Sequence, residues 1–234
     1  MRTPTLIALT LAASTAAAGI TNELIINGGF ETGDFTGWTP FVQEGSSGDI
    51  FVTDLDLGES LPFSGNPGID NGGHPLGLAI GPSSGQYYAA VDQSGPGAYS
   101  LEQTFTTSAN ATEFAISFDL FAGDASLQAP LNSGNFDYSG APTQYLRVDL
   151  FNAAGALITN LIDATPLTLY MMVSQDLSAI MEAEQTYTLR LEHVDNMDNF
   201  HTALDSVSVS ENVPAPSTLA LLALAGIASR RHRD

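Results

Sequence analysis

The feature that most constrains the fold is an alternation of apolar and polar residues in short runs. Within residues 113–122, the apolar side chains of Phe114, Ile116, Phe118 and Leu120 occupy every second position. Successive side chains of a β-strand point to opposite faces, so such a run fits a strand that is buried on one face only. This run is therefore predicted to be a half-buried antiparallel strand.

Runs of short, apolar or aromatic segments cover the middle of the chain and are separated by clusters of Gly, Asn, Asp, Ser and Pro. The predicted strands are residues 22–26, 37–42, 49–55, 86–91, 98–106, 113–122, 144–152, 167–177, 185–194 and 202–210. Only "DLSAIMEAEQ" looks helical, and it predicts a one- or two-turn helix around Ser178 to Glu184. Many short strands with turn signals between them predict an all-β fold, an antiparallel two-sheet β-sandwich.

The charge of the chain is strongly one-sided. Its 234 residues carry a formal net charge of -20 and no lysine, and of its arginines only Arg147 and Arg190 lie away from the extreme ends. Such a surface repels phosphate backbones and anionic lipid, which argues against nucleic-acid binding. The chain has no cysteine, so it has neither a disulfide framework nor a thiolate metal site.

The N-terminus has the three parts of a secretory signal. Arg2 is followed by an apolar stretch from Leu6 to Ala13, and Ala16 and Ala18 form an A-x-A arrangement. This pattern predicts that residues 1–18 are a signal peptide removed before Gly19. The alternative is a short buried helix.

Two long polar loops interrupt the predicted strands. They are residues 58–77, "GESLPFSGNPGIDNGGHPLG", and residues 123–143, "GDASLQAPLNSGNFDYSGAPT". Loops of this length are uncommon unless they are functional or mobile, so we expect ligand contacts there.

Motifs for catalysis are weak. "GPSSG", Gly81 to Gly85, matches the G-x-S-x-G pattern, but a nucleophile elbow needs a helix after the serine and here a predicted strand follows. The histidines His74, His193 and His201 lack the spacing of zinc sites. The acids of "DLD" at residues 54–56 and "DNMD" at 195–198 are read as solvated turn residues.

Three segments resemble the carbohydrate-binding-module-like, galactose-binding-like jelly rolls. They are "LIINGGFETGDFTGWT" at residues 24–39, "YYAAVDQSGPGAYSLEQTFTT" at 87–107 and "ALDSVSVS" at 203–210. The resemblance implies a jelly-roll β-sandwich over residues 19–212, with the first and last strands close together. Trp38, the only tryptophan, is predicted to fill the core rather than to offer a platform for a sugar.

The same resemblance implies a structural calcium ion beside the turn after the first strand. The matching positions are Glu31 and Asp205, with Asn27 a weaker candidate ligand. Calcium takes six to eight oxygen ligands and accepts mixed carboxylate and carbonyl donors. The alternative is that Glu31 and Asp205 only accept hydrogen bonds from turn amides.

The C-terminal segment, residues 213–234, resembles the PEP-CTERM sorting signal of Gram-negative bacteria, which the membrane protease exosortase processes. Val213, Pro214, Ala215 and Pro216 match its V-P-E-P motif, with Ala215 in place of the usual glutamate. The resemblance implies cleavage near residues 214–217.

An apolar stretch and an arginine cluster follow that motif. As a short C-terminal hydrophobic helix, Leu219 to Ala228 would rise only about 15 Å, against about 30 Å for the hydrocarbon core of a membrane. Arg230, Arg231 and Arg233 would hold its cytoplasmic end. This combination predicts a transient inner-membrane anchor.

These features predict an exported, non-catalytic protein of the cell surface or extracellular matrix, sorted by an exosortase-type system. Its partners would be that protease and an extracellular polysaccharide, since the lectin-like fold is suited to glycan binding. The alternative is an acidic extracellular glycoside hydrolase that uses loop carboxylates. A hydrolase should bring two carboxylates together about 5 to 10 Å apart in one cleft, whereas a binding module should show a shallow face with exposed aromatic rings and no such pair.

Overall fold

The structure is a computed structural model, and it describes residues 19–55, 61–63, 81–124, 136–140, 142–163, 171–197 and 200–215. The strands are β1 (Ile20–Glu23), β2 (Thr39–Val42), β3 (Gly48–Thr53), β4 (Tyr88–Gln93), β5 (Gly97–Thr106), β6 (Glu113–Asp124), β7 (Gln144–Asn152), β8 (Leu157–Asp163), β9 (Met171–Asp176), β10 (Thr186–Asp195) and β11 (Phe200–Val213). The described residues contain no α-helix.

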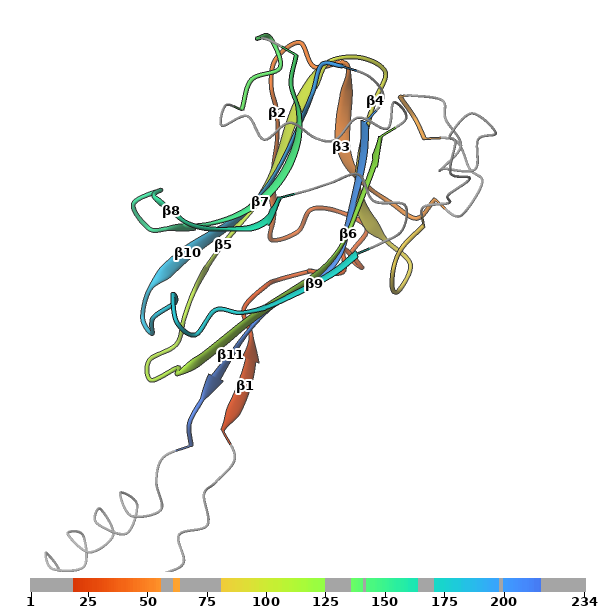
Figure 1. The fold of residues 1–234 in the computed structure, drawn as a ribbon. Coiled ribbons are helices and arrows are strands. Elements are labelled where there is room, and N and C mark those ends of the chain that lie inside the picture. The colour runs from red at the N-terminus through yellow and green to blue at the C-terminus, as the bar shows by residue number, and fades with distance from the viewer. Residues whose placement is uncertain are drawn as a thin grey trace, which may run out of the picture.

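Two antiparallel sheets face each other in two layers (Figure 1). The six-stranded sheet has the order β3-β4-β11-β6-β9, and β1 pairs with β11. The five-stranded sheet has the order β2-β5-β10-β7-β8. The predicted all-β, antiparallel β-sandwich is thus confirmed, and it is consistent with a jelly roll.

The core lies between the sheets, where the alternating residues of the sequence predict it. Phe114, Ile116, Phe118 and Leu120 of β6 are all buried in the main hydrophobic cluster. Burying an aliphatic or aromatic side chain of this size contributes about 1.5 to 3 kcal/mol, so this one face supplies a large share of the folding free energy. Trp38 is also buried and packs on Phe30 with ring centroids 5.6 Å apart.

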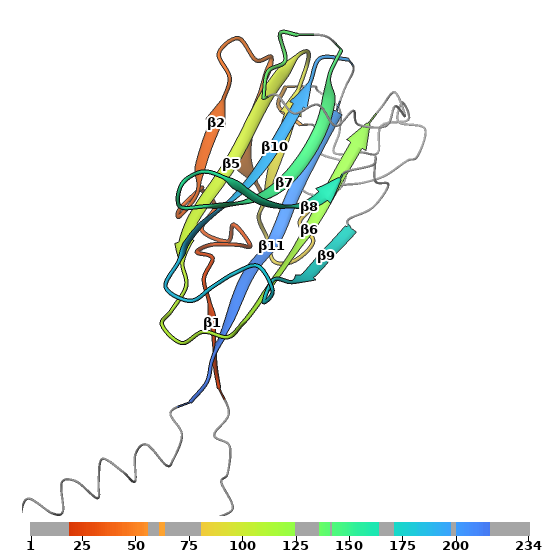
Figure 2. The same cartoon turned by 60° about the vertical axis from the view of Figure 1, so that its left-hand side comes forward.

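The first and last strands pair, as predicted. Ile20 lies opposite Val213, and both ends of the described domain leave the sandwich on the same side (Figures 1 and 2). β1 is shorter than the predicted run at 22–26 and begins and ends earlier. It ends at Glu23 because the carboxylate of this residue accepts backbone hydrogen bonds where a further strand residue would otherwise accept them. Glu23 Oε1 accepts hydrogen bonds from the backbone amides of Ile25 and Val209, both at 2.9 Å.

One strand was not predicted from the sequence. β8 reads "LITNLID", in which the apolar residues come in adjacent pairs rather than at every second position. It forms an edge of the five-stranded sheet through pairing with β7, and its register shifts twice. The missing alternation therefore reflects irregular pairing at an edge strand.

The predicted helix around Ser178 to Glu184 is wrong. The backbone amides of Ile180 and Met181 both donate to the carbonyl of Leu177, which makes a single turn. Glu184 has a positive φ of 56°, a conformation that cannot continue a right-handed helix. The packing of Leu177 and Met181 into the core decides the local conformation.

Several predictions fall outside the described residues. These are the signal peptide at 1–18, most of both long loops, Pro216, the apolar stretch from Leu219 to Ala228, and the arginines Arg230, Arg231 and Arg233. Within the described ranges, no helix has the length and apolar character needed to cross a membrane.

Candidate functional site

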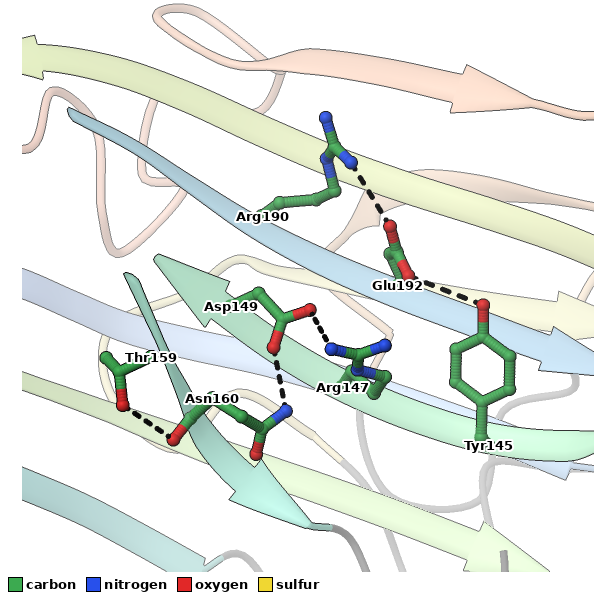
Figure 3. Close-up of polar contacts among 7 residues, drawn as sticks. All are labelled: Tyr145, Arg147, Asp149, Thr159, Asn160, Arg190 and Glu192. Carbon is green, nitrogen blue, oxygen red and sulfur yellow. Dashed lines mark hydrogen bonds and ion pairs between the residues drawn. The ribbon is translucent and has the colours of Figure 1, made fainter. Parts of the chain in front are cut away.

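The side of the five-stranded sheet that faces away from the core carries a polar and aromatic surface, which we call the outer face. Its side chains come from the alternate positions of β5, β10 and β7, between the residues that point into the core. It includes Ser100, Glu102, Tyr145, Arg147, Asp149, Phe151, Arg190 and Glu192. Arg147 and Arg190, the two arginines that lie away from the ends of the sequence, are therefore both on this face (Figure 3).

Arg190 of β10 is the centre of this surface. Its Nε lies 2.6 Å from Glu102 Oε1 on β5, and its Nη1 lies 3.3 Å from Glu192 Oε1. Its Cζ also lies 4.5 Å from the ring centroid of Phe151 on β7, a cation–π contact. One guanidinium thus holds two carboxylates and an aromatic ring from three adjacent strands.

A second group continues the surface toward β8. Arg147 Nη2 lies 2.8 Å from Asp149 Oδ2, and the Asn160 amide donates to Asp149 Oδ1 at 2.7 Å (Figure 3). The Tyr145 hydroxyl donates to Glu192 Oε2 at 3.3 Å. Burial, followed by the charge of Glu192, raises the pKa of Tyr145 above its usual value, so this hydroxyl remains a hydrogen-bond donor.

A groove of about 320 Å³ opens beside Arg190. Its lining residues are Thr39, Phe41, Ser100, Glu102, Phe136, Arg190 and Glu192. Phe41 of β2 is 53% exposed, and its ring centroid lies 5.8 Å from that of Phe136. The exposed Phe41 and the half-buried Phe136 adjoin two carboxylates in fixed positions, which offers both a ring for stacking and acceptors for hydroxyl groups.

The predicted calcium ligands Glu31 and Asp205 both bind the turn at 81–87. Glu31 Oε1 accepts hydrogen bonds from the backbone amides of Gln86 and Tyr87, at 2.9 and 3.1 Å. Asp205 Oδ2 accepts from the backbone amides of Ser83 and Ser84, at 2.8 and 3.0 Å. These contacts are those of the alternative, in which both carboxylates accept hydrogen bonds from turn amides.

The same residues keep some capacity for a hard cation. Among the described contacts, Asp205 Oδ1 accepts only the Ser206 amide and Glu31 Oε2 accepts none. Burial raises the pKa of Asp205, although hydrogen bonds from Ser84 and Ser83 oppose this shift. These two carboxylate oxygens are of the donor type that calcium takes, and the ion stays a prediction.

Asn27 stabilises the turn that follows β1, at residues 27–34. Its Oδ1 accepts the Thr32 amide at 3.2 Å and its Nδ2 donates to the carbonyl of Asp34 at 2.9 Å. Its own carbonyl accepts the indole N–H of Trp38 at 3.1 Å. Because its side chain and its carbonyl are both engaged, Asn27 is the weakest of the three predicted ligands.

The "GPSSG" segment forms a turn that leads into β4, not into a helix. Ser83 Oγ lies 2.9 Å from Asp205 Oδ2 and 2.8 Å from Asp119 Oδ2. The backbone amides of Ser83 and Ser84 donate to Asp205, so they cannot form an oxyanion hole. These contacts hold the turn against β11 and β6.

The core histidines are buried and do not gather as metal ligands. His193 Nδ1 lies 2.7 Å from Thr202 Oγ1, and its ring stacks on Phe200 with centroids 4.6 Å apart. His201 Nδ1 lies 3.2 Å from Asp92 Oδ1 on the other side of its sheet. Within the described ranges, no three His, Asp or Glu side chains are placed to share a metal ion. His74 lies outside those ranges.

The outer face was not predicted as a site, because the sequence analysis expected ligand contacts in the two long loops. One signal in the sequence pointed to it. Arg190 and Glu192, like Arg147 and Asp149, are two residues apart in predicted strands, so each pair must share a face. Only the cross-strand register brings the two pairs onto the same sheet.

No protein-family profile matches the chain, and no curated protein matches its sequence. Solved structures with a similar backbone include TmCBM61 in complex with β-1,4-galactotriose, with a TM-score of 0.49 and 11% identity over 80% of this chain and 97% of the other. A family 11 carbohydrate-binding module from Clostridium thermocellum, in complex with a mixed-linked tetrasaccharide, has a TM-score of 0.42 and 10% identity, covering 86% and 99%. A Stig cyclase from Fischerella has a TM-score of 0.45 and 16% identity, covering 84% and 100%.

Carbohydrate-binding modules with β-sandwich folds are therefore among the structures similar to this chain. Cyclases from Fischerella are also among them. At these identities and TM-scores, the matches assign neither a family nor a ligand.

Proposed function

We propose that this protein is an exported, non-catalytic surface or matrix protein that binds neutral glycans through its outer face. The observation that carries the proposal is the groove in which the Phe41–Phe136 pair adjoins Glu102 and Glu192. A sugar ring has an apolar face of C–H groups and an edge of hydroxyl groups. The groove offers an aromatic ring for the first and charged acceptors for the second.

The charge of the site favours neutral sugars. Arg190 is already paired with Glu102 and Glu192, so it has little free positive charge to offer an anionic ligand. The chain as a whole repels anions, given its net charge of -20. Polysaccharides that carry carboxylate or sulfate groups should therefore bind more weakly than neutral ones.

A second groove is larger but less suited to a sugar. It holds about 510 Å³ and is lined by acidic and polar side chains of β6, β9, β11 and β1, including Glu113, Asp176 and Glu211. Among the described residues that line it, the only aromatic one is Phe114, which is buried in the core. Without an exposed ring, this groove lacks the stacking surface that the outer face provides.

Polysaccharide retention tests the proposal. The exported protein is run through gels that contain a panel of neutral and anionic polysaccharides, and reducing ends are measured in parallel. Phe41→Ala should weaken retention by about tenfold or more, since stacked aromatic contacts are typical hot spots of binding. Met172→Ala is the control, because Met172 is 75% exposed on the opposite sheet.

Three results would count against the proposal. Unchanged retention of Phe41→Ala would move any glycan site elsewhere. An absence of retention on every polysaccharide would remove glycan binding altogether. Release of reducing ends would favour the hydrolase alternative, with either Glu102 and Glu192 of this groove or the loop carboxylates, which lie mostly outside the described residues, as its acids.

The proposal includes export and sorting. The signal peptide would direct the chain out of the cytoplasm, and the tail from Val213 would hold it in the inner membrane until exosortase cleavage. The pairing of Ile20 with Val213 supports this order, because it brings the two processing sites to one end of the sandwich. β2, which carries Phe41, lies at the other end (Figure 1), where it would face away from the membrane.

A further inference from the structure

One end of the core is polar rather than apolar, and we call these residues the inner polar cluster. They are Gln93 on β4, Gln144 on β7, His193 and Asp195 on β10, and Thr202 on β11. All five are buried, and four of them have no exposed surface. Asp195 is one of the four, so its prediction as a solvated turn residue is wrong. The interior of a β-sandwich is normally filled by apolar side chains, so a polar cluster of this size needs a physical explanation.

The cluster joins the two sheets. The Gln93 amide of the six-stranded sheet donates to Asp195 Oδ2 of the five-stranded sheet. His193 Nδ1 lies 2.7 Å from Thr202 Oγ1, again across the two sheets. Gln144 lies directly opposite Asp195 on the neighbouring strand, so their side chains share one side of the sheet.

Four polar atoms of this cluster have no protein partner. They are Gln93 Oε1, Gln144 Oε1, Gln144 Nε2 and His193 Nε2. Leaving a buried polar atom without a hydrogen bond costs free energy comparable to a lost hydrogen bond, and native proteins rarely do so. All four belong to side chains that are fully buried, so bulk solvent does not reach them.

The chemistry of these atoms selects the ligand. Gln144 Nε2 can only donate, whereas the two amide oxygens can only accept. A cation would bind the oxygens and leave Gln144 Nε2 unpaired, and an anion would lie beside the Asp195 carboxylate. A water molecule both donates and accepts, so it is the one small ligand that matches the whole set.

We propose that the inner polar cluster binds about two ordered water molecules, each bridging Gln93, Gln144 and their neighbours. Buried waters typically make about three hydrogen bonds each, so two waters that also bond to each other would pair with the four atoms available here. The adjoining residues of β7 and β10, Tyr145 and Val194, point to the outer side of the same sheet. The bound water would thus stiffen the five-stranded sheet directly behind the outer face.

Nuclear magnetic resonance on the ¹⁵N-labelled protein tests the proposal. Water-selective NOE spectra should show cross-peaks between water and the Nε2 protons of Gln144. Gln103 provides a matched control in the same protein, because it is also buried but both its amide oxygen and its amide nitrogen are hydrogen-bonded to the backbone of Ile26, at 2.6 and 2.9 Å. The Gln103 side-chain protons should show no such cross-peaks.

A pair of leucine variants gives a second measurement. Gln144→Leu breaks no direct hydrogen bond within the protein but removes bonds to the bound water, so its urea midpoint should fall only slightly. Gln103→Leu leaves both backbone groups of Ile26 unpaired, so its midpoint should fall clearly. The water cross-peaks at the Gln93 side chain should weaken in Gln144→Leu and persist in Gln103→Leu.

Two outcomes overturn the proposal. One is a wild-type spectrum without water cross-peaks at Gln144. The other is a saturable shift of the Gln144 side-chain resonances on titration with sodium, potassium or calcium chloride, which would assign the site to a cation. The wild-type spectrum decides the question even if a leucine variant fails to fold.

Discussion

Asp205 of β11 and Ser83 of the 81–87 turn are bound twice, through the amide of Ser83 at 2.8 Å and through its hydroxyl at 2.9 Å. The two residues lie far apart in the sequence, and Asp205 has no exposed surface. The carboxylate therefore acts as a fixed acceptor that orders a turn made of small residues.

Replacing Asp205 should be costly. In Asp205→Ala the amides of Ser83, Ser84 and Ser206 lose their acceptor. We expect the free energy of unfolding to fall by about 3 kcal/mol, since each unpaired amide costs about 1 kcal/mol or more. Urea denaturation measures the change, with Ser174→Ala on the exposed side of β9 as the control. A loss no larger than that of the control would contradict this role for Asp205.

A side chain at Gly85 should destabilise the protein. Its φ is +69°, and a Cβ there would lie 2.1 Å from Glu31 Oε1. Gly155 has a similar φ of +74°, but its Cβ would meet nothing within 4 Å. Gly155→Ala should therefore cost only about 1 kcal/mol of backbone strain, whereas Gly85→Ala should cost clearly more because the Glu31 contacts break. Equal thermal midpoints for the two variants would contradict the close approach of Glu31.

Calcium removal tests the predicted ion. If Glu31 and Asp205 hold calcium, excess chelator should lower the thermal midpoint of the wild type, and added calcium should restore it by mass action. Glu31→Gln should lose most of this response while it keeps an acceptor oxygen for the turn amides. A wild-type midpoint that chelator leaves unchanged would favour the alternative, in which both carboxylates only cap the turn.

Acid should destabilise the protein through His193. Burial, followed by the charge of His201, lowers the pKa of His193 to about 3, against 6.5 for an ordinary histidine. Between these values the unfolded chain binds a proton that the folded chain does not, so the free energy of unfolding falls as the pH falls from about 6.5 toward 3. The contribution is complete above about 6.5, and its slope is at most about 1.4 kcal/mol per pH unit.

Denaturation between pH 7 and pH 4 measures this slope. His193→Gln should show a shallower dependence on pH than the wild type, because glutamine does not titrate. His201 beside Asp92, and Asp195 on the same strand, are present in both proteins, so their contributions cancel in the comparison. Parallel curves for the two proteins would show that His193 does not titrate differently on folding.

Mass spectrometry of the protein recovered from outside the cell tests the processing prediction. We expect the mature chain to begin at Gly19 and to end near residues 214–217. A secreted form that still carries Arg230, Arg231 and Arg233 would contradict cleavage of the tail. A form that begins at Met1 would contradict the signal peptide.

Local pattern determined the architecture of this protein to a large extent. The alternation in β6 identified a strand and the face that it buries, because the two-residue period of a strand is a property of the backbone itself. The same reasoning failed for β8 and for the turn after β9. There, pairing at a sheet edge and burial of Leu177 and Met181 decided the conformation.

The candidate sites depend on contacts that no local pattern contains. The family resemblance predicted Glu31 and Asp205 as calcium ligands, but only the fold shows that both hold the same turn. The groove requires Glu102 of β5 to lie opposite Arg190 of β10, and a shift of one residue in that register would send the side chain to the core. Sequence alone specified most of the strands and, for those that alternate, the face that each one buries. The tertiary structure decided which strands are neighbours, because register is set by the packing of the whole core.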